Sequence, residues 1–378
     1  MEDLGVYAFF FSLSTIVFFL TNLGFRQLIV TSSIYHDTSQ YMKVRFVLSI
    51  ISMVFVSVVG FLLKPDYFVL CLLISSIKFF ESISEIGYAY FQKYQNHNYQ
   101  SKLLFFKSLL SGLLVYFLIK QGFTLTQILF FISSLHFASI VFFELPKLKE
   151  ELVSLSFFNV FMLNRSDFEF VKFAFPLGVG LFLINLNLNL SRIMSGMYLS
   201  EFDTAVLAAS LQLSLALTPV VTGFSQVILP KFSKLISNSS VEKAISYFVV
   251  LTIVLFFMST LLMMGAYFFG EVILEYIYNS DIANCYYIFT VCLLGVSFNY
   301  IASLSTVVLT ACEKYKLQRD IMLFCIVINL FLMLLFIDHY GLASLAWSFV
   351  LSSFLRLFLL YVYAGRTLIS IRRLKSIP

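Results

Sequence analysis

The chain has 378 residues, of which 60% are hydrophobic and only 12% are charged, and its mean hydropathy is +0.93. Soluble globular proteins carry about 25% charged residues, so this chain has too few polar side chains to cover a surface that faces water. The composition excludes a soluble enzyme, and the scattered basic residues behind the net charge of +5 exclude a nucleic-acid binder. An integral membrane protein with several spans remains.

Membrane-spanning helices need roughly 20 mostly apolar residues, and the sequence contains eleven such segments. None of them shows the alternating pattern of a membrane β-strand. The expected fold class is therefore an all-α polytopic membrane protein. In chain order, the predicted spans are 5–25, 46–63, 67–86, 103–119, 124–143, 173–196, 203–225, 246–265, 281–301, 321–337 and 341–363.

The basic residues predict the orientation, because Lys and Arg concentrate in cytoplasmic connections. Most of the 25 basic residues fall on one side of the predicted spans, whereas the opposite side holds only Lys64 and Lys120. The C-terminus, with its basic tail, is therefore expected in the cytoplasm. Residues assigned to the basic side include, in chain order, Lys43, Arg45, Lys102, Lys107 and Arg366.

The longest predicted connection, 144–172, is cytoplasmic and separates two lobes. The N-terminal lobe, 1–143, has five spans, and the C-terminal lobe, 173–378, has six spans and the basic tail. Eleven spans with a cytoplasmic C-terminus put Met1 outside. Five of the twelve residues 3–14 are also identical to those at 203–214, at an offset of 200 residues, which would pair the first visible span with the second span of the C-terminal lobe. Both arguments predict a twelfth span upstream of Met1.

Two stretches carry motifs that are more specific than hydropathy. The first begins with an acidic entry at residues 2–7 and ends in Asn22-Leu23-Gly24-Phe25-Arg26, and the second contains Pro176, Ser191-Arg192, Gly196 and the turn 201–205. They resemble the second span and the seventh and eighth spans of Wzx-type polysaccharide and O-antigen flippases. These flippases belong to the multidrug/oligosaccharidyl-lipid/polysaccharide exporter superfamily. Asn22 and Ser191 replace the Asp that is usual at both positions.

The resemblance implies a MATE-like bundle of two six-helix lobes around a cavity that opens alternately to each side of the membrane. The first family span would be absent from this chain. The implied function is transport, not catalysis: translocation of an undecaprenyl-pyrophosphate-linked oligosaccharide across the bacterial inner membrane for O-antigen, lipopolysaccharide, capsule or exopolysaccharide assembly. The implied partners are this lipid-linked cargo, the bilayer, and the polysaccharide polymerase and chain-length machinery.

Charged residues inside spans are costly and therefore mark candidate sites. Lys78, Glu81 and Glu85 lie three and four residues apart in the predicted span 67–86, so they share one helical face. One interpretation is a cavity site that couples transport to a cation or proton. The other is a structural ion pair, with Glu85 at the cytoplasmic interface.

Three arginines are candidates for binding the cargo, because a guanidinium can donate two parallel hydrogen bonds to phosphate oxygens. Arg192 lies late in its span, Arg356 lies in the middle of the last span, and Arg26 ends the first visible span. Arg192 could instead reach the outer headgroups, and Arg26 could instead be a cytoplasmic interface residue. Asn185 and Asn189, one helical turn apart, could bind sugar hydroxyls or another helix.

The remaining motifs limit the chemistry. The sequence has no Walker A motif, and its five Cys and four His show no metal-binding spacing, so neither ATP hydrolysis nor a cofactor is expected. Energy, where required, would come from an H+ or Na+ gradient, the membrane potential or consumption of the cargo. Two alternatives stay open: an ion-coupled multidrug antiporter of the same fold, and a membrane glycan polymerase or ligase, although the largest outer connection, 266–280, is short for such an enzyme.

Overall fold

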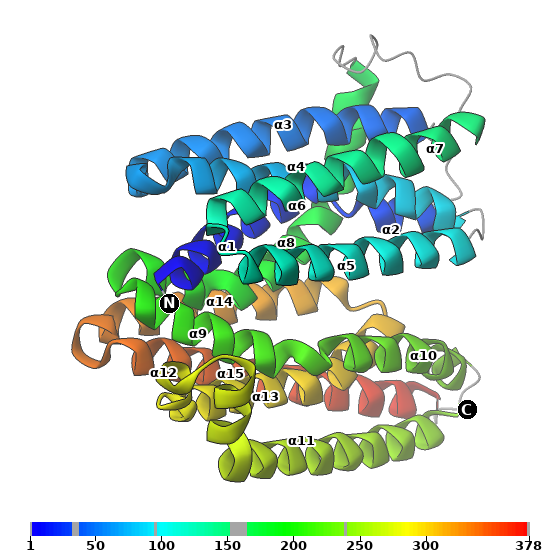
Figure 1. The fold of residues 1–378 in the computed structure, drawn as a ribbon. Coiled ribbons are helices and arrows are strands. Elements are labelled where there is room, and N and C mark those ends of the chain that lie inside the picture. Colours follow the sequence, from blue (N-terminus) through cyan, green and yellow to red (C-terminus); the bar gives the residue numbers. More distant parts are fainter. Residues whose placement is uncertain (1, 32–37, 94–96, 152–164, 238–239, 376–378) are drawn as a thin grey trace. The chain divides into compact units, whose positions relative to one another are not determined.

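The computed structural model describes residues 2–31, 38–93, 97–151, 165–237 and 240–375. All regular secondary structure in these ranges is helical (Figure 1). The chain divides into two compact units: a first unit, Val6–Asn189, and a second unit, Leu190–Pro378 together with Met1–Gly5. The division falls inside two helices: α1, which runs from Glu2 to Asn22, and α8, which runs from Arg165 to Tyr198.

The first unit is built around α4, which packs against α2, α3, α5 and α6. Pro65 follows the end of α3 and starts a short 3-10 turn, and a capping box at Thr124 begins α6. Helix α6 continues through a five-residue π-helical turn, Ile140–Glu144, into α7. The helices of this unit are α1 Glu2–Asn22, α2 Phe25–Thr31, α3 Thr38–Leu63, α4 Phe68–Lys93, α5 His97–Lys120, α6 Leu125–Ser139 and α7 Leu145–Glu151.

Helix α13 is the centre of the second unit, where it packs against α9, α10, α11 and α15. Its membrane-spanning window is the most buried of all the candidate spans, at 72%. Among the described residues, the helices of this unit after α8 are α9 Glu201–Ser214, α10 Thr218–Ser237, α11 Val241–Ile277, α12 Ser280–Ala283, α13 Tyr286–Ala311, α14 Tyr315–Tyr340 and α15 Leu342–Lys375.

Gly295 allows α13 and α15 to approach closely. A Cβ atom at this position would lie 2.7 Å from ring carbons of Phe349, whose side chain is buried. We expect Gly295→Ala to destabilise the protein by about 1–3 kcal/mol, because a packed ring would have to move. Thermal unfolding of the purified protein in detergent measures this effect. Gly112→Ala on α5 is the matched control, since its Cβ would meet nothing within 4 Å, and equal stability of both variants would contradict the prediction.

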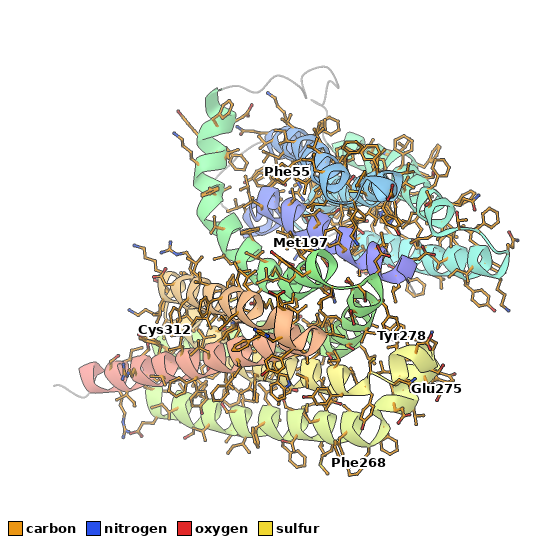
Figure 2. The ribbon with its side chains drawn as sticks, turned by 90° about the vertical axis from the view of Figure 1, so that its left-hand side faces the viewer. Phe55, Met197, Phe268, Glu275, Tyr278 and Cys312 are labelled. Atoms are coloured by element: carbon orange, nitrogen blue, oxygen red, sulfur yellow. The ribbon has the colours of Figure 1, made fainter. Side chains whose placement is uncertain are left out.

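The predicted all-α polytopic fold class is confirmed at the level of the spans. Ten helices in the described ranges are long and apolar enough to cross a membrane. Large apolar side chains on their outer surfaces are exposed, for example Phe55 on α3 and Phe268 on α11 (Figure 2), as expected where helices face lipid. The sixth predicted span, 173–196, lies within α8, which is not among these ten.

Several predicted connections are in fact helical. The span predicted at 46–63 begins at Gln40, which puts Lys43 and Arg45 inside it, and the span predicted at 103–119 begins at Asn98, which puts Lys102 inside it. Lys107 was assigned to the basic side although it falls within the predicted span, and the structure places it in that span. The outer connection predicted at 266–280 is mostly the end of α11. The predicted linker 144–172 begins inside a span that extends to Leu148, and its central part, 152–164, lies outside the described residues.

Candidate functional site

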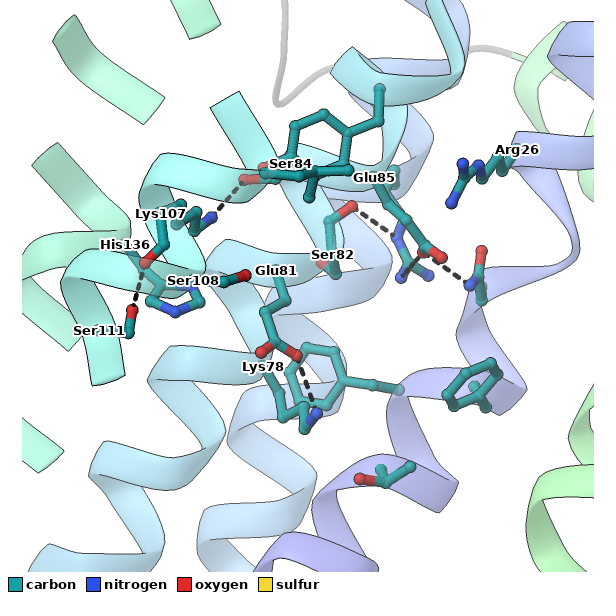
Figure 3. A pocket seen from close by; sticks show the side chains of 17 residues that line it. Arg26, Lys78, Glu81, Ser82, Ser84, Glu85, Lys107, Ser108, Ser111 and His136 are labelled. Atoms are coloured by element: carbon teal, nitrogen blue, oxygen red, sulfur yellow. Dashed lines mark hydrogen bonds and ion pairs between the residues drawn. The ribbon is translucent and has the colours of Figure 1, made fainter. Parts of the chain in front are cut away.

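The first unit contains a polar cavity of about 670 Å³ between helices α1 to α6. Figure 3 shows the side chains that line it. Four basic and two acidic residues line the cavity, which gives the lining an excess of two positive charges when His136 is neutral. The charged and titratable lining residues are Arg26, Arg45, Lys78, Glu81, Glu85, Tyr88, Lys107 and His136.

Helix α4 contributes the three charged residues that the sequence pattern places on one face. Lys78, Glu81 and Glu85 all line the cavity. The ammonium of Lys78 donates to Glu81 Oε2 at 2.8 Å and lies 4.1 Å from the centre of the Phe11 ring. Glu85 does not take part in this pair; it accepts a hydrogen bond from Asn22 Nδ2 at 2.8 Å.

Arg45 is buried deep in the wall of the cavity, with only 2% of its side chain exposed. Its Nε donates to the Ser82 carbonyl at 3.3 Å, and its Nη2 lies 3.6 Å from Glu85 Oε2. Within the part of the chain that the structure describes, Nη1 has no hydrogen-bond partner. A guanidinium buried in this way needs the opposite charge of Glu85, because an unpaired buried charge is very costly.

A second buried charge cluster lies behind the wall, around Glu144 at the end of the π-helical turn. Glu144 Oε1 accepts hydrogen bonds from Ser84 Oγ at 3.0 Å, Tyr88 OH at 3.2 Å and Ser139 Oγ at 3.2 Å. The ammonium of Lys107 lies 3.8 Å from the same oxygen and donates to Ser84 Oγ at 3.4 Å. The Glu144 carboxylate is 2% exposed, so it compensates the charge of Lys107 in a low-dielectric environment.

Arg26 differs from the other three basic residues of the cavity. Lys78, Arg45 and Lys107 each have a carboxylate within 4 Å, whereas the guanidinium of Arg26 donates only to the neutral Gln92 Oε1, at 3.3 and 3.4 Å. In the described ranges, no carboxylate pairs with Arg26. Arg26 is therefore the lining cation with the most charge left for a bound anion.

Sequence reasoning missed four members of this site. Arg45 and Lys107 were assigned to the basic side of the membrane, Glu144 to the start of the linker, and His136 to a dispersed set without a role. Arg45 and Glu144 lie just outside the predicted spans 46–63 and 124–143, so longer predicted spans would have included them. Lys107 and His136 fall inside predicted spans, where a titratable side chain is itself a signal of a site. The ion pairs of Arg45 and Lys107 join different helices, so no short sequence motif indicates which residue each of them contacts.

The other two arginines lie in the second unit. Arg356 on α15 donates to Asn299 Oδ1 on α13 at 2.8 Å, and Asn299 also donates to Ser353 Oγ at 2.9 Å. Arg192 on α8 is buried, with 7% of the residue exposed.

Asn185 and Asn189 lie on α8 at the end of the first unit and do not line the cavity. Asn189 Nδ2 donates to the Asn185 carbonyl one turn earlier, at 2.9 Å. Among the described residues, no group of three His, Cys, Asp or Glu side chains could hold a metal ion. The charged and polar residues that line the cavity can act on a bound molecule through charge and hydrogen bonds.

Comparison with solved structures identifies the fold. The chain superimposes on a MATE family multidrug transporter of the MOP superfamily in its inward-facing conformation, with a TM-score of 0.79 and 12% identity over 100% of this chain and 92% of that chain. It also superimposes on the lipid II flippase MurJ in an inward closed conformation, with a TM-score of 0.69 and 16% identity over 98% of this chain and 88% of that chain. The predicted MATE-like fold is therefore confirmed.

A relative in sequence comes from Staphylococcus aureus. Its capsular polysaccharide biosynthesis protein CapF is 25% identical over 373 residues, which cover 97% of this chain and 91% of CapF. No protein-family model matches the chain.

Proposed function

We propose that this protein is a flippase that moves a polyprenyl-pyrophosphate-linked oligosaccharide across the bacterial inner membrane by alternating access, with a cytoplasmic C-terminus. The observation that carries the proposal is the cavity in the first unit, where basic residues outnumber acidic ones inside membrane-spanning helices. A diphosphate can enter a low-dielectric site only if positive charge compensates it. The similarity to CapF and to the fold of MurJ supports this function.

In this proposal Arg26 binds the pyrophosphate while the lipid tail stays in the bilayer. Arg26 can do so because it has no carboxylate partner among the described residues and can donate to two phosphate oxygens. The two lobes, 1–143 and 173–378, would then open toward the other side of the membrane. During this change the headgroup would bind to Arg192 and Arg356, together with Asn185 and Asn189. Lys78, Glu81 and Glu85 would couple this change to H+ or Na+.

The runner-up function is an ion-coupled multidrug antiporter. The observation that favours it is the exposed carboxylate of Glu81 in a cavity that also contains Phe18 and Phe19, because cationic drugs bind to carboxylates and aromatic rings. The pairing of Glu81 with Lys78 at 2.8 Å weighs against it, since that carboxylate is already neutralised.

A gene deletion distinguishes the two functions. If the protein is a flippase, the deletion strain loses its surface polysaccharide, accumulates the lipid-linked saccharide on the cytoplasmic face and recovers both properties when the gene is restored. Extraction of lipid-linked saccharides and labelling of surface sugars measure these outcomes. A strain that keeps its polysaccharide and becomes sensitive to cationic drugs would instead support the antiporter.

A further inference from the structure

The cavity of the first unit has two ends with different chemistry. Arg26, a cation without a carboxylate partner in the described chain, lies at one end on α2. Lys107, Ser108, Ser111 and His136 stand together at the other end, on α5 and α6 (Figure 3). We call these four residues the α5–α6 wall.

The polar residues of α5 are concentrated on this wall. Between residues 103 and 119 the polar side chains are Lys107, Ser108, Ser111 and Tyr116, and the first three of these line the cavity. Serine in a membrane helix often serves close helix packing. That role does not apply here, because only 6% of the spanning window of α5 is buried and Ser108 is exposed.

The wall is polar but close to neutral. The ammonium of Lys107 is compensated by Glu144, whose Oε1 lies 3.8 Å away. Serine hydroxyls and an imidazole both donate and accept hydrogen bonds without a net charge. A neutral surface of this kind suits hydroxyl groups, whereas the uncompensated charge of Arg26 suits a phosphate.

His136 provides the second, independent observation. Its side chain lines the cavity although the residue is only 9% exposed, and its Nδ1 atom has no hydrogen-bond partner within the described ranges. A buried polar atom without a partner costs about 1–3 kcal/mol. The Nδ1 atom is itself buried from the cavity, whereas Nε2 is accessible there and can donate to or accept from a hydroxyl group according to the tautomer of the ring.

We propose that the α5–α6 wall is a saccharide subsite, which binds the hydroxyl groups of a neutral sugar near the pyrophosphate. This inference rests on the proposed flippase function and adds the residues that select the sugar. Ser108, Ser111 and His136 hydrogen-bond the sugar, and Glu144 is a positioning residue that holds Lys107 beside it. The lipid-borne diphosphate lies toward Arg26.

Binding of two lipids to the full chain in nanodiscs tests the subsite. One lipid is undecaprenyl pyrophosphate without sugar, and the other is the lipid-linked saccharide that accumulates in the deletion strain. We expect the double variant Ser108→Ala/Ser111→Ala, and separately His136→Leu, to weaken binding of the saccharide-bearing lipid by about fivefold or more, the effect of one lost hydrogen bond. Binding of the sugar-free lipid should stay within about twofold, which also shows that each variant is folded.

Ser134→Ala is the matched control. Ser134 on α6 donates to the Phe130 carbonyl one turn earlier, as Ser111 donates to the Lys107 carbonyl, but Ser134 does not line the cavity. The subsite is wrong if the wall variants weaken both lipids equally or neither, or if the wild-type protein binds both lipids with the same affinity. If the wild-type protein binds neither lipid, or if no lipid-linked saccharide accumulates, the flippase function itself is wrong.

Discussion

Replacing Arg26 by Ala should reduce the affinity for undecaprenyl pyrophosphate about 10- to 100-fold and remove most surface polysaccharide. A hydrogen bond to a charged group contributes about 1.5–3 kcal/mol, and Arg26 is the lining cation that no described carboxylate neutralises. Arg26→Lys should keep part of the affinity, because lysine retains the charge but cannot donate in a bidentate geometry. Lipid binding in nanodiscs and labelling of surface sugars in the complemented deletion strain measure the two effects.

The control for this experiment replaces an arginine outside the cavity, so that the net charge of the protein changes but the lining of the cavity does not. Arg319 is suitable, because it is about half exposed and pairs with the adjacent Asp320 at 2.9 Å. Arg319→Ala should leave lipid binding and surface polysaccharide unchanged. Normal binding and normal polysaccharide in Arg26→Ala would show that the pyrophosphate binds elsewhere, with Arg192 and Arg356 as the remaining arginine candidates.

Removing the carboxylate of Glu144 should have the largest effect on stability. In Glu144→Leu the ammonium of Lys107 loses its compensating charge, and the hydroxyls of Ser84, Tyr88 and Ser139 lose their common acceptor. Breaking a buried ion pair from one side costs about 3–5 kcal/mol. Thermal unfolding in detergent, followed by the loss of monodisperse protein, measures this cost.

A double variant separates the charge effect from a general packing defect. Lys107→Met combined with Glu144→Leu removes both charges, so it should recover much of the stability lost in Glu144→Leu. Glu242→Gln is the matched control, since Glu242 is exposed and pairs with Arg372, and an exposed pair contributes about 1 kcal/mol or less. A double variant as unstable as the single variant would mean that the ion pair does not explain the role of Glu144.

Hydropathy predicted the fold well because the membrane imposes the length and polarity of each span. The face shared by Lys78, Glu81 and Glu85 could also be predicted, since it depends only on helical spacing within α4. The ends of the spans were predicted less well. A lysine or arginine near the end of an apolar segment has the same local sequence whether it reaches the cytoplasm or turns inward.

Arg45 illustrates the limit of such predictions. The guanidinium of Arg45 is held inside the protein by Ser82 and Glu85, which lie on another helix, 37 and 40 residues later in the chain. The sequence around Arg45 therefore does not reveal that the residue is buried. The same holds for Lys107 and Glu144, which are 37 residues apart. Arg45 and Lys107, which the topology prediction places on the cytoplasmic side, thus line the cavity.

The π-helical turn at Ile140–Glu144 lets this segment hold an extra residue without a change in the direction of the side chains on either side of it. Side chains eight positions apart on a regular α-helix, such as His136 and Glu144, are about 80° out of phase. A π turn contains more residues per turn, so it rotates less per residue and brings the imidazole and the carboxylate closer to one face. Loss of one residue between 140 and 143 would leave the two side chains seven positions apart on a regular α-helix, which is within about 20° of the same face. The π turn therefore absorbs one extra residue while the imidazole and the carboxylate keep a similar orientation, so this segment can gain or lose one codon without turning the two side chains apart.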